Sequence, residues 1–115
     1  MTAEDVRRLI YGQIVSKAVQ AFVLLGLPDV MRDAEHSPDR LARSVGADPG
    51  ALRRLLRALV AFRVVRETAE DTFALRPMGH QLRSDAPRTA RPTALLAANV
   101  VGRAWDGIVH TVHTG

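Results

Sequence analysis

The sequence predicts a mainly helical domain that contains one small β-hairpin. Apolar residues recur at the helical spacing in several segments, and such a period indicates helices with one buried side. Polar caps followed by proline mark helix starts, and glycines mark helix ends. Two short β-prone runs flank a polar turn, which is typical of a hairpin. A chain of 115 residues is expected to form a single domain, 1–115.

Composition excludes several classes of protein. The chain is 47% hydrophobic and 24% charged and has no cysteine, so we expect a globular protein without disulfides or thiolate metal sites. The acidic N-terminus, Met1–Asp5, is unlike a signal peptide, and the apolar runs are too short to span a membrane. We therefore expect a cytoplasmic protein with no membrane partner. The net charge of +4 is almost entirely arginine, and Lys17 is the single lysine.

The first long helix is expected over residues 3–25. Thr2 can cap its start and Gly26 ends it. Tyr11 and Val15 widen its apolar side beyond what one small core requires. The helix therefore either lies across the domain's own core or offers apolar surface to another subunit. Its apolar positions at helical spacing are Val6, Leu9, Ile10, Ile14, Ala18, Ala21, Phe22 and Leu25.

The next elements follow the order of a winged helix-turn-helix fold. Ser37-Pro38 and Asp48-Pro49 each supply a cap followed by proline at the first helical position. Helix, helix, turn, helix, hairpin is the winged-helix order. The expected elements are a short helix over 28–34, helices over 38–45 and 50–62, and a hairpin of strands 64–67 and 72–75.

The C-terminal part is expected to add more helices. A helical turn over 77–82 and a polar loop over 84–91 precede a helix over 92–101. Gly102 is predicted to break that helix before another over 104–112.

The helix over 50–62 holds the position of a DNA-recognition helix, but its residues disfavour that use. Its first turn follows Asp48 and offers no side-chain donor to a base. The predicted hairpin tip, 67–71, is acidic and would repel phosphate. A DNA-binding regulator therefore remains only an alternative. The exposed arginines that it would use are Arg53, Arg54 and Arg57.

No catalytic, cofactor-binding or metal-binding residue is predicted in this chain. His110 and His113 have a spacing that two metal ligands can use, but no third ligand is near in sequence. No glycine-rich phosphate loop is present. Trp105 and Asn99 are candidates to line a pocket for a small aromatic molecule, since tryptophan offers a flat ring face. The alternatives are a core position for Trp105 and a helix cap or interhelical hydrogen bond for Asn99.

Several short motifs, in order along nearly the whole chain, carry a resemblance to a known family. They are Leu24–Asp29, Leu41–Ala42 with Val45–Ala47, Leu52–Leu59, Phe73–Leu75 with Gly79 and Leu82, and Trp105 leading to Thr114–Gly115. With these motifs the chain resembles the N-terminal dimerisation domain of S-adenosylmethionine (SAM)-dependent O-methyltransferases, the group of plant caffeate-type and bacterial polyketide-tailoring enzymes. The resemblance implies a winged-helix fold that binds no DNA, pairs subunits through long interlocked helices and closes one side of the acceptor pocket.

The same resemblance predicts partners for the chain. It implies a homodimer, or a heteromer with a methyltransferase-domain protein, and a small aromatic acceptor. SAM is implied for the whole family enzyme, but the Rossmann-like domain that binds it and supplies the catalytic histidine has no counterpart here. A further alternative is a stand-alone protein that binds or rearranges a polyketide-like molecule. The predicted dimer interface consists of Val6, Leu9, Ile10, Ile14, Ala18 and Phe22.

Overall fold

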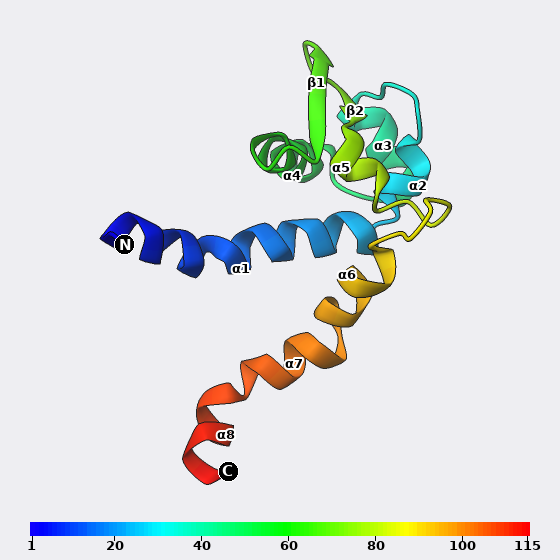
Figure 1. The fold of residues 1–115 in the computed structure, drawn as a ribbon. Helices are drawn as coiled ribbons and strands as arrows, with labels where there is room; N and C mark the ends of the chain where they lie inside the picture. The colour runs from blue at the N-terminus through cyan, green and yellow to red at the C-terminus, as the bar shows by residue number, and fades with distance from the viewer.

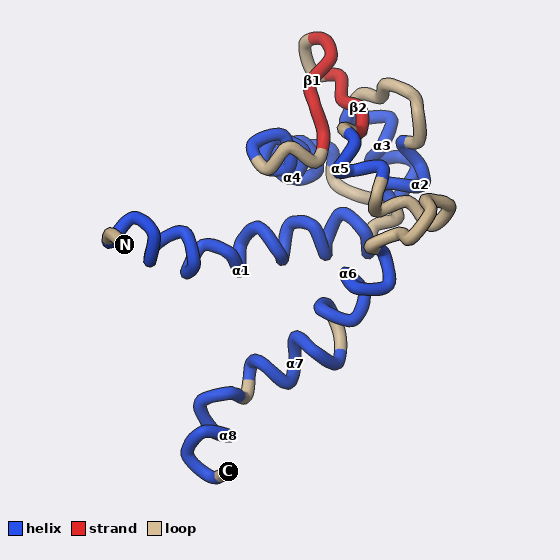
Figure 2. Tube along the Cα trace, viewed as in Figure 1, coloured by secondary structure: helices blue, strands red, loops and turns tan.

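The computed structural model describes residues 1–115 as helices around a single small hairpin (Figure 1). Figure 2 shows how little of the chain is strand. The mainly helical, winged-helix-like architecture predicted from the sequence is confirmed. The elements are α1 (Ala3–Leu24), α2 (Leu27–Met31), α3 (Pro38–Val45), α4 (Pro49–Ala61), β1 (Val65–Ala69), β2 (Thr72–Leu75), α5 (Pro77–His80), α6 (Arg91–Ala98), α7 (Val100–Asp106) and α8 (Ile108–Thr114).

Local hydrogen bonds explain where the first helices begin. The backbone N–H of Asp5 donates to Thr2 Oγ1 over 3.3 Å, and the backbone N–H of Thr2 donates to the Asp5 carboxylate over 2.7 Å. The Ser37 hydroxyl accepts from the backbone N–H of Arg40 at the start of α3, and the Asp48 carboxylate accepts from the backbone N–H of Ala51 at the start of α4. These bonds satisfy N–H groups that lack a partner inside the helix. The predicted caps are therefore present.

The hairpin is fastened to the helical body by a third short extended segment. β1 and β2 pair antiparallel, with Val65 opposite Leu75. On the edge of β2 that faces away from β1, Phe73 exchanges two backbone hydrogen bonds with His36, of 2.8 and 2.9 Å. Since the chain between α2 and α3 thereby joins the sheet, the wing cannot swing away from the body without breaking backbone pairing.

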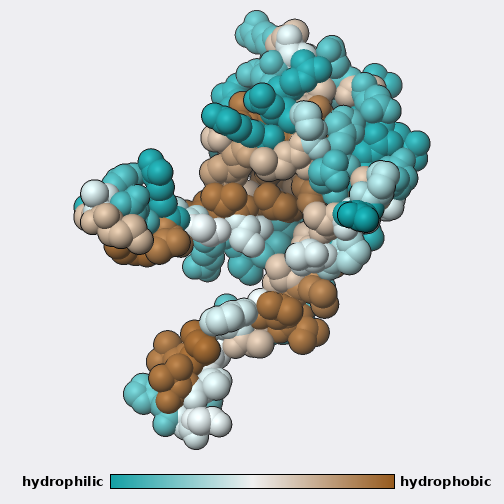
Figure 3. All heavy atoms as spheres, viewed as in Figure 1, coloured by the Kyte–Doolittle hydropathy of each residue, from teal (hydrophilic) through white to brown (hydrophobic).

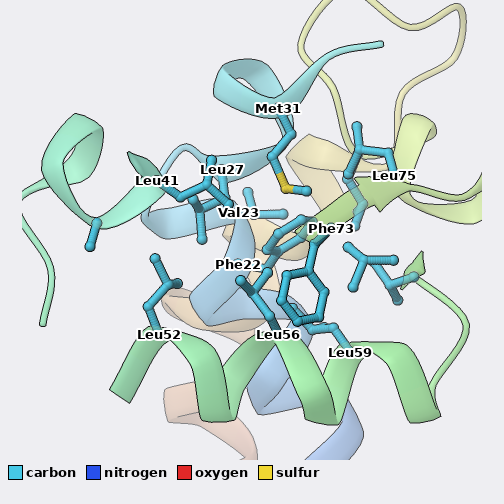
Figure 4. Close-up of a cluster of buried hydrophobic side chains, with 14 residues drawn as sticks. Phe22, Val23, Leu27, Met31, Leu41, Leu52, Leu56, Leu59, Phe73 and Leu75 are labelled. Atoms are coloured by element: carbon cyan, nitrogen blue, oxygen red, sulfur yellow. The ribbon is translucent and has the colours of Figure 1, made fainter. Parts of the chain in front are cut away.

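The hydrophobic core lies where α1, α4 and β2 meet (Figure 4). Phe22 from α1 and Phe73 from β2 are both fully buried there. Leucines of α4 complete one side, which agrees with their helical spacing. Of α1, therefore, only the C-terminal half contributes side chains to the core. Its other large members are Val23, Leu27, Met31, Leu41, Leu52, Leu56, Leu59, Val64, Val65, Leu75 and Leu82.

The loop before α6 is fixed to α2 and the turn that follows it. Ser84 donates its backbone N–H to the Asp29 carboxylate over 2.8 Å. Arg83 forms ion pairs with Asp85, at 2.8 Å, and with Asp33, at 3.3 Å. These contacts hold the start of α6 near the C-terminal end of α1.

The C-terminal helices break at positions other than the predicted one. The helix that starts at Arg91 ends before Asn99, whose φ of −117° and ψ of −107° are not helical. Gly102 lies inside α7, so the predicted break at this residue is wrong. A β-carbon at Gly102 would lie 2.2 Å from the Ala97 carbonyl oxygen. Glycine thus permits the close approach at the α6–α7 bend and does not end the helix. A further break falls at Gly107.

Two helical arms project from the body (Figure 1). One is the N-terminal half of α1, and the other is the run α6–α8. The arms lie together where α1 packs on α6 and then diverge. Figure 3 shows hydrophobic atoms on α7–α8 and on the exposed end of α1. The molecule is elongated, at 50 × 31 × 29 Å, and many large apolar side chains of the two arms are exposed.

Gly79 and Gly12 form a matched pair that tests the packing of α5. A β-carbon at Gly79 would lie 2.3 Å from the Val64 carbonyl oxygen, whereas one at Gly12 would meet nothing within 4 Å. We expect Gly79→Ala to lower the free energy of unfolding by about 1–3 kcal/mol and Gly12→Ala to raise it by about 0.5–1 kcal/mol. Urea denaturation at one protein concentration measures both, and equal effects of the two substitutions would contradict the close contact at Gly79.

Candidate functional site

The exposed half of α1 presents an apolar face to solvent. Leu9 is 78% exposed and Ile10 66% exposed, and Val6 and Ile14 are also exposed. Isolated apolar side chains on a surface are common, but a contiguous group along one helix is typical of an interface. We call Val6, Leu9, Ile10 and Ile14 the α1 face. They match four of the six residues that the helical spacing predicts for the dimer interface.

The other two residues predicted for this interface, Ala18 and Phe22, pack in the domain's own core. Phe22 is 0% exposed, and Ala18 is half-buried against the core cluster. At about 100° per residue, Leu9 lies about 140° around the helix axis from Phe22. The helix therefore buries one side at its C-terminal end and exposes a different apolar side at its N-terminal end. The assignment of Phe22 to the interface is corrected, since no free surface of this side chain remains.

A second exposed apolar group, which the sequence did not lead us to assign to an interface, lies on the C-terminal arm. Its helical spacing was visible in the sequence, but the arm could equally have folded back onto the core. In the structure the C-terminal arm does not fold back onto the core, and its apolar side chains stay exposed (Figure 3). The group consists of Val100, Val101, Trp105, Ile108, Val109 and Val112.

A notch of about 360 Å³ separates α1 from α7. Trp105 lines it and is 65% exposed, so the core position considered for Trp105 is wrong. Asn99 does not line it, and its side-chain amide donates to the Leu95 carbonyl oxygen over 2.8 Å. Of the two candidate pocket residues, the structure thus places only Trp105 at a hollow. The notch is lined by Gln13, Ser16, Lys17, Gln20, Ala97, Val101, Gly102, Trp105 and Asp106.

The recognition-helix position of α4 is partly occupied by an ion pair within the chain. The Arg53 guanidinium donates from Nε and Nη2 to the two carboxylate oxygens of Asp71, each over 2.8 Å. Such a two-pronged contact is the strongest geometry for this pair. Arg53 therefore fastens the hairpin turn to α4, while Arg54 and Arg57 remain exposed. The basic face of α4 is smaller than its sequence suggests.

This ion pair predicts a pH dependence. Hydrogen bonding from Arg53 lowers the pKa of the Asp71 carboxyl below its ordinary value of 3.8. Because the folded-state pKa is the lower one, the pair stabilises the fold above about pH 4 and this contribution is lost as the pH falls further. We expect Asp71→Asn to lower the melting temperature near neutral pH, with the difference from the parent chain shrinking toward pH 3. Asparagine keeps the shape and tolerates the φ of +54° at this position.

Glu70→Gln is the control for this titration. Glu70 is exposed at the same turn, and its side chain forms no ion pair. Thermal melts by circular dichroism between pH 3 and pH 7 compare the two variants. If the melting temperature of Asp71→Asn differs from that of the parent chain by the same amount across this range, the Asp71 charge does not stabilise the fold through Arg53.

The chain contains no assembled metal centre or membrane-spanning helix. No three His, Cys, Asp or Glu side chains gather as a metal site would require, so His110 and His113 stay an isolated pair. None of the helices is both long and apolar enough to cross a bilayer. The single sheet has two antiparallel strands.

Comparison with known proteins decides the family. The family model described as "O-methyltransferase dimerisation domain" matches residues 7–85, which include the core and the whole winged-helix unit. The chain belongs to this family. Self-association is thus the family property that this description implies, and the α1 face is one of the apolar surfaces that the fold of this dimerisation domain leaves exposed.

Relatives of the dimerisation domain are bacterial methyltransferases. It is 38% identical over 109 residues to O-methyltransferase SfmM3 of Streptomyces lavendulae, covering 95% of this chain and 33% of that protein. It is 36% identical over 112 residues to O-demethylpuromycin-O-methyltransferase of Streptomyces alboniger, covering 97% of this chain and 30% of the relative. The chain therefore spans about a third of the length of these relatives.

A solved structure gives the same result for the fold. The chain superposes on N,N-8-amino-8-demethyl-D-riboflavin dimethyltransferase (RosA) from Streptomyces davawensis with a TM-score of 0.92 at 36% identity. The match covers 100% of this chain and 35% of that one. The diverging α1 and α6–α8 arms are included in this match, so they are part of the fold that the two proteins share.

Proposed function

We propose that this dimerisation domain joins two subunits of a SAM-dependent methyltransferase that acts on a small aromatic natural product. The observation that carries the proposal is the exposed apolar surface of the two arms, on α1 and on α7–α8. Neither surface is covered within the chain, and both lie outside the core. Burial of apolar side chains from both arms would provide the main driving force for pairing.

The partner in this proposal is a second copy of the same chain. A symmetric dimer uses the same patch on both subunits, so the apolar surfaces of the two arms of one chain can meet the same surfaces of a second copy. A heteromer with a methyltransferase-domain protein would use the same two arms. SAM would bind in a catalytic domain, as the sequence leads us to expect, while this domain would close one side of the acceptor pocket. The names of the relatives, which include a 3-amino-4-hydroxybenzoate 4-O-methyltransferase, support a small aromatic acceptor.

Sedimentation equilibrium tests the pairing. We expect a dimer at micromolar concentration, with little dependence on salt because the contact is apolar. A monomer at the highest concentration tested would refute the proposal. The same samples can be mixed with duplex DNA at low salt. We expect no mobility shift, because the Asp71 carboxylate already pairs with Arg53 and the turn carries further acidic residues.

A further inference from the structure

The notch between α1 and α7 places two charged side chains beside the exposed ring of Trp105, which also belongs to the apolar group of the C-terminal arm. Its α1 wall carries Lys17, the single lysine of the chain, which takes part in none of the ion pairs of the structure. Its α7 wall carries Trp105, the single tryptophan, with its ring exposed. The Asp106 carboxylate also borders the notch and forms no ion pair with Lys17.

The α1 side of the notch also carries a hydrogen-bonded polar pair. Gln20 is a buried polar side chain, at 7% exposure, and its amide donates to Ser16 Oγ over 2.9 Å. Ser16 and Gln20 also border an adjoining hollow of about 260 Å³, which is lined mainly by apolar residues. The two hollows therefore form one surface, apolar at the α6 end and polar at the α7 end. Small-molecule sites commonly pair an apolar lining with a few such polar groups.

The size and chemistry of the notch select a class of ligand. A volume of about 360 Å³ falls within the range of small-molecule pockets. A planar ring can stack on the exposed indole of Trp105. An anionic substituent on the ring would meet the unpaired ammonium of Lys17. A hydroxyl or amino group of the ligand could donate to the Asp106 carboxylate, which borders the same notch.

We propose that the notch between α1 and α7 binds a planar aromatic molecule that carries an anionic group, with the ring against Trp105 and the anion beside Lys17. Lys17 is then a specificity-determining residue that separates aromatic acids from their neutral analogues. If this ligand is the methyl acceptor, the assignment rests on the proposed function, but binding can be tested without methyl transfer.

The single tryptophan allows a direct test by NMR. In the 115-residue chain labelled with ¹⁵N, one indole N–H signal reports Trp105 alone. The probes are 2-naphthoate and its neutral analogue 2-naphthamide, which have the same ring and nearly the same shape. We expect a saturable shift of the indole signal with 2-naphthoate, and binding about fivefold weaker for 2-naphthamide, which is the effect of about 1 kcal/mol from one partly exposed ion pair.

Two matched variants test whether Lys17 causes the preference for 2-naphthoate over 2-naphthamide. Lys17→Met keeps the length and helix propensity of the side chain but removes its charge. It should bind both probes equally and weakly. Arg103→Met removes a cation from the same helix as Trp105 but outside the notch, and should keep the preference. Circular dichroism confirms that both variants fold.

Three binding results would overturn the proposal, and a comparison of monomer with dimer gives a fourth. The three binding results are an indole signal that neither probe shifts, equal affinity of the parent chain for the two probes, or a preference that survives in Lys17→Met. Sedimentation of the same samples reports pairing independently, so failure of the ligand site and failure of the proposed dimer are distinguishable. If a monomeric Leu9→Glu variant binds 2-naphthoate while the dimer does not, the notch is filled by the second copy and is not a ligand site.

Discussion

Replacement of Leu9 by glutamate is expected to convert the dimer into a monomer. Leu9 is 78% exposed on the α1 face, so the fold of one chain does not depend on it. In a dimer the same position would be buried, and an unpaired carboxylate there would have to lose its hydration. The loss of a hot-spot side chain at the centre of an interface costs about 2 kcal/mol or more, and burying a charge at Leu9 adds to the loss of its apolar contact. We therefore expect the dissociation constant to rise by at least about 30-fold.

The control for Leu9→Glu is Met78→Glu. Met78 is an apolar side chain of comparable exposure, at 56%, on α5 in the body of the domain. Both variants should fold, with Met78→Glu melting at the temperature of the parent dimer and Leu9→Glu losing only the stability that pairing adds. Only Leu9→Glu should change the mass distribution in sedimentation equilibrium. If Leu9→Glu remains a dimer of unchanged affinity, the dimer contact does not use the α1 face and must lie on α7–α8.

Replacement of Phe73 by alanine is expected to have the largest effect on stability. Phe73 is fully buried, and its ring lies beside Phe22 above the leucines of α4 (Figure 4). Deleting it removes apolar contacts and leaves a cavity at the junction of α1, α4 and β2, which costs about 3–5 kcal/mol. Domains of this size have a free energy of unfolding of about 5–15 kcal/mol, so the variant would lose a large fraction of its stability.

Urea denaturation followed by circular dichroism measures this loss. The variants must be compared at one protein concentration, because pairing adds to apparent stability. Met78→Ala is the matched control, and as an exposed substitution it should change the free energy of unfolding by less than about 0.5 kcal/mol. If Phe73→Ala costs no more than Met78→Ala, the core is not centred on β2.

The local elements of this protein were largely predictable from its sequence. The starts of α1, α3 and α4 follow from Thr2, Ser37 and Asp48, because each cap bonds to a backbone group three residues away. The winged-helix order follows from the succession of these helices and the hairpin. The family was recognisable too, since its motifs are spread in order along the chain and the family model matches most of them.

The candidate surfaces were predictable only in part. The spacing of apolar residues identifies α1 as a helix with more apolar surface than one core needs, yet the same spacing placed Phe22 and Leu9 in one group. The exposed apolar group of the C-terminal arm and the notch beside Trp105 were not predictable, because an amphipathic helix does not reveal whether it folds onto its own core.

The sequence by itself determined the helices, the hairpin, the family and the absence of cysteine chemistry, because these depend on contacts within a few residues or on composition. Tertiary structure decided which apolar side of each helix is buried and which remains free. It also joined Arg53 to Asp71, 18 residues apart, and bent the chain at Asn99 with Gly102 packed against Ala97. These features depend on how distant segments approach one another, and residue spacing along one helix carries no information about that.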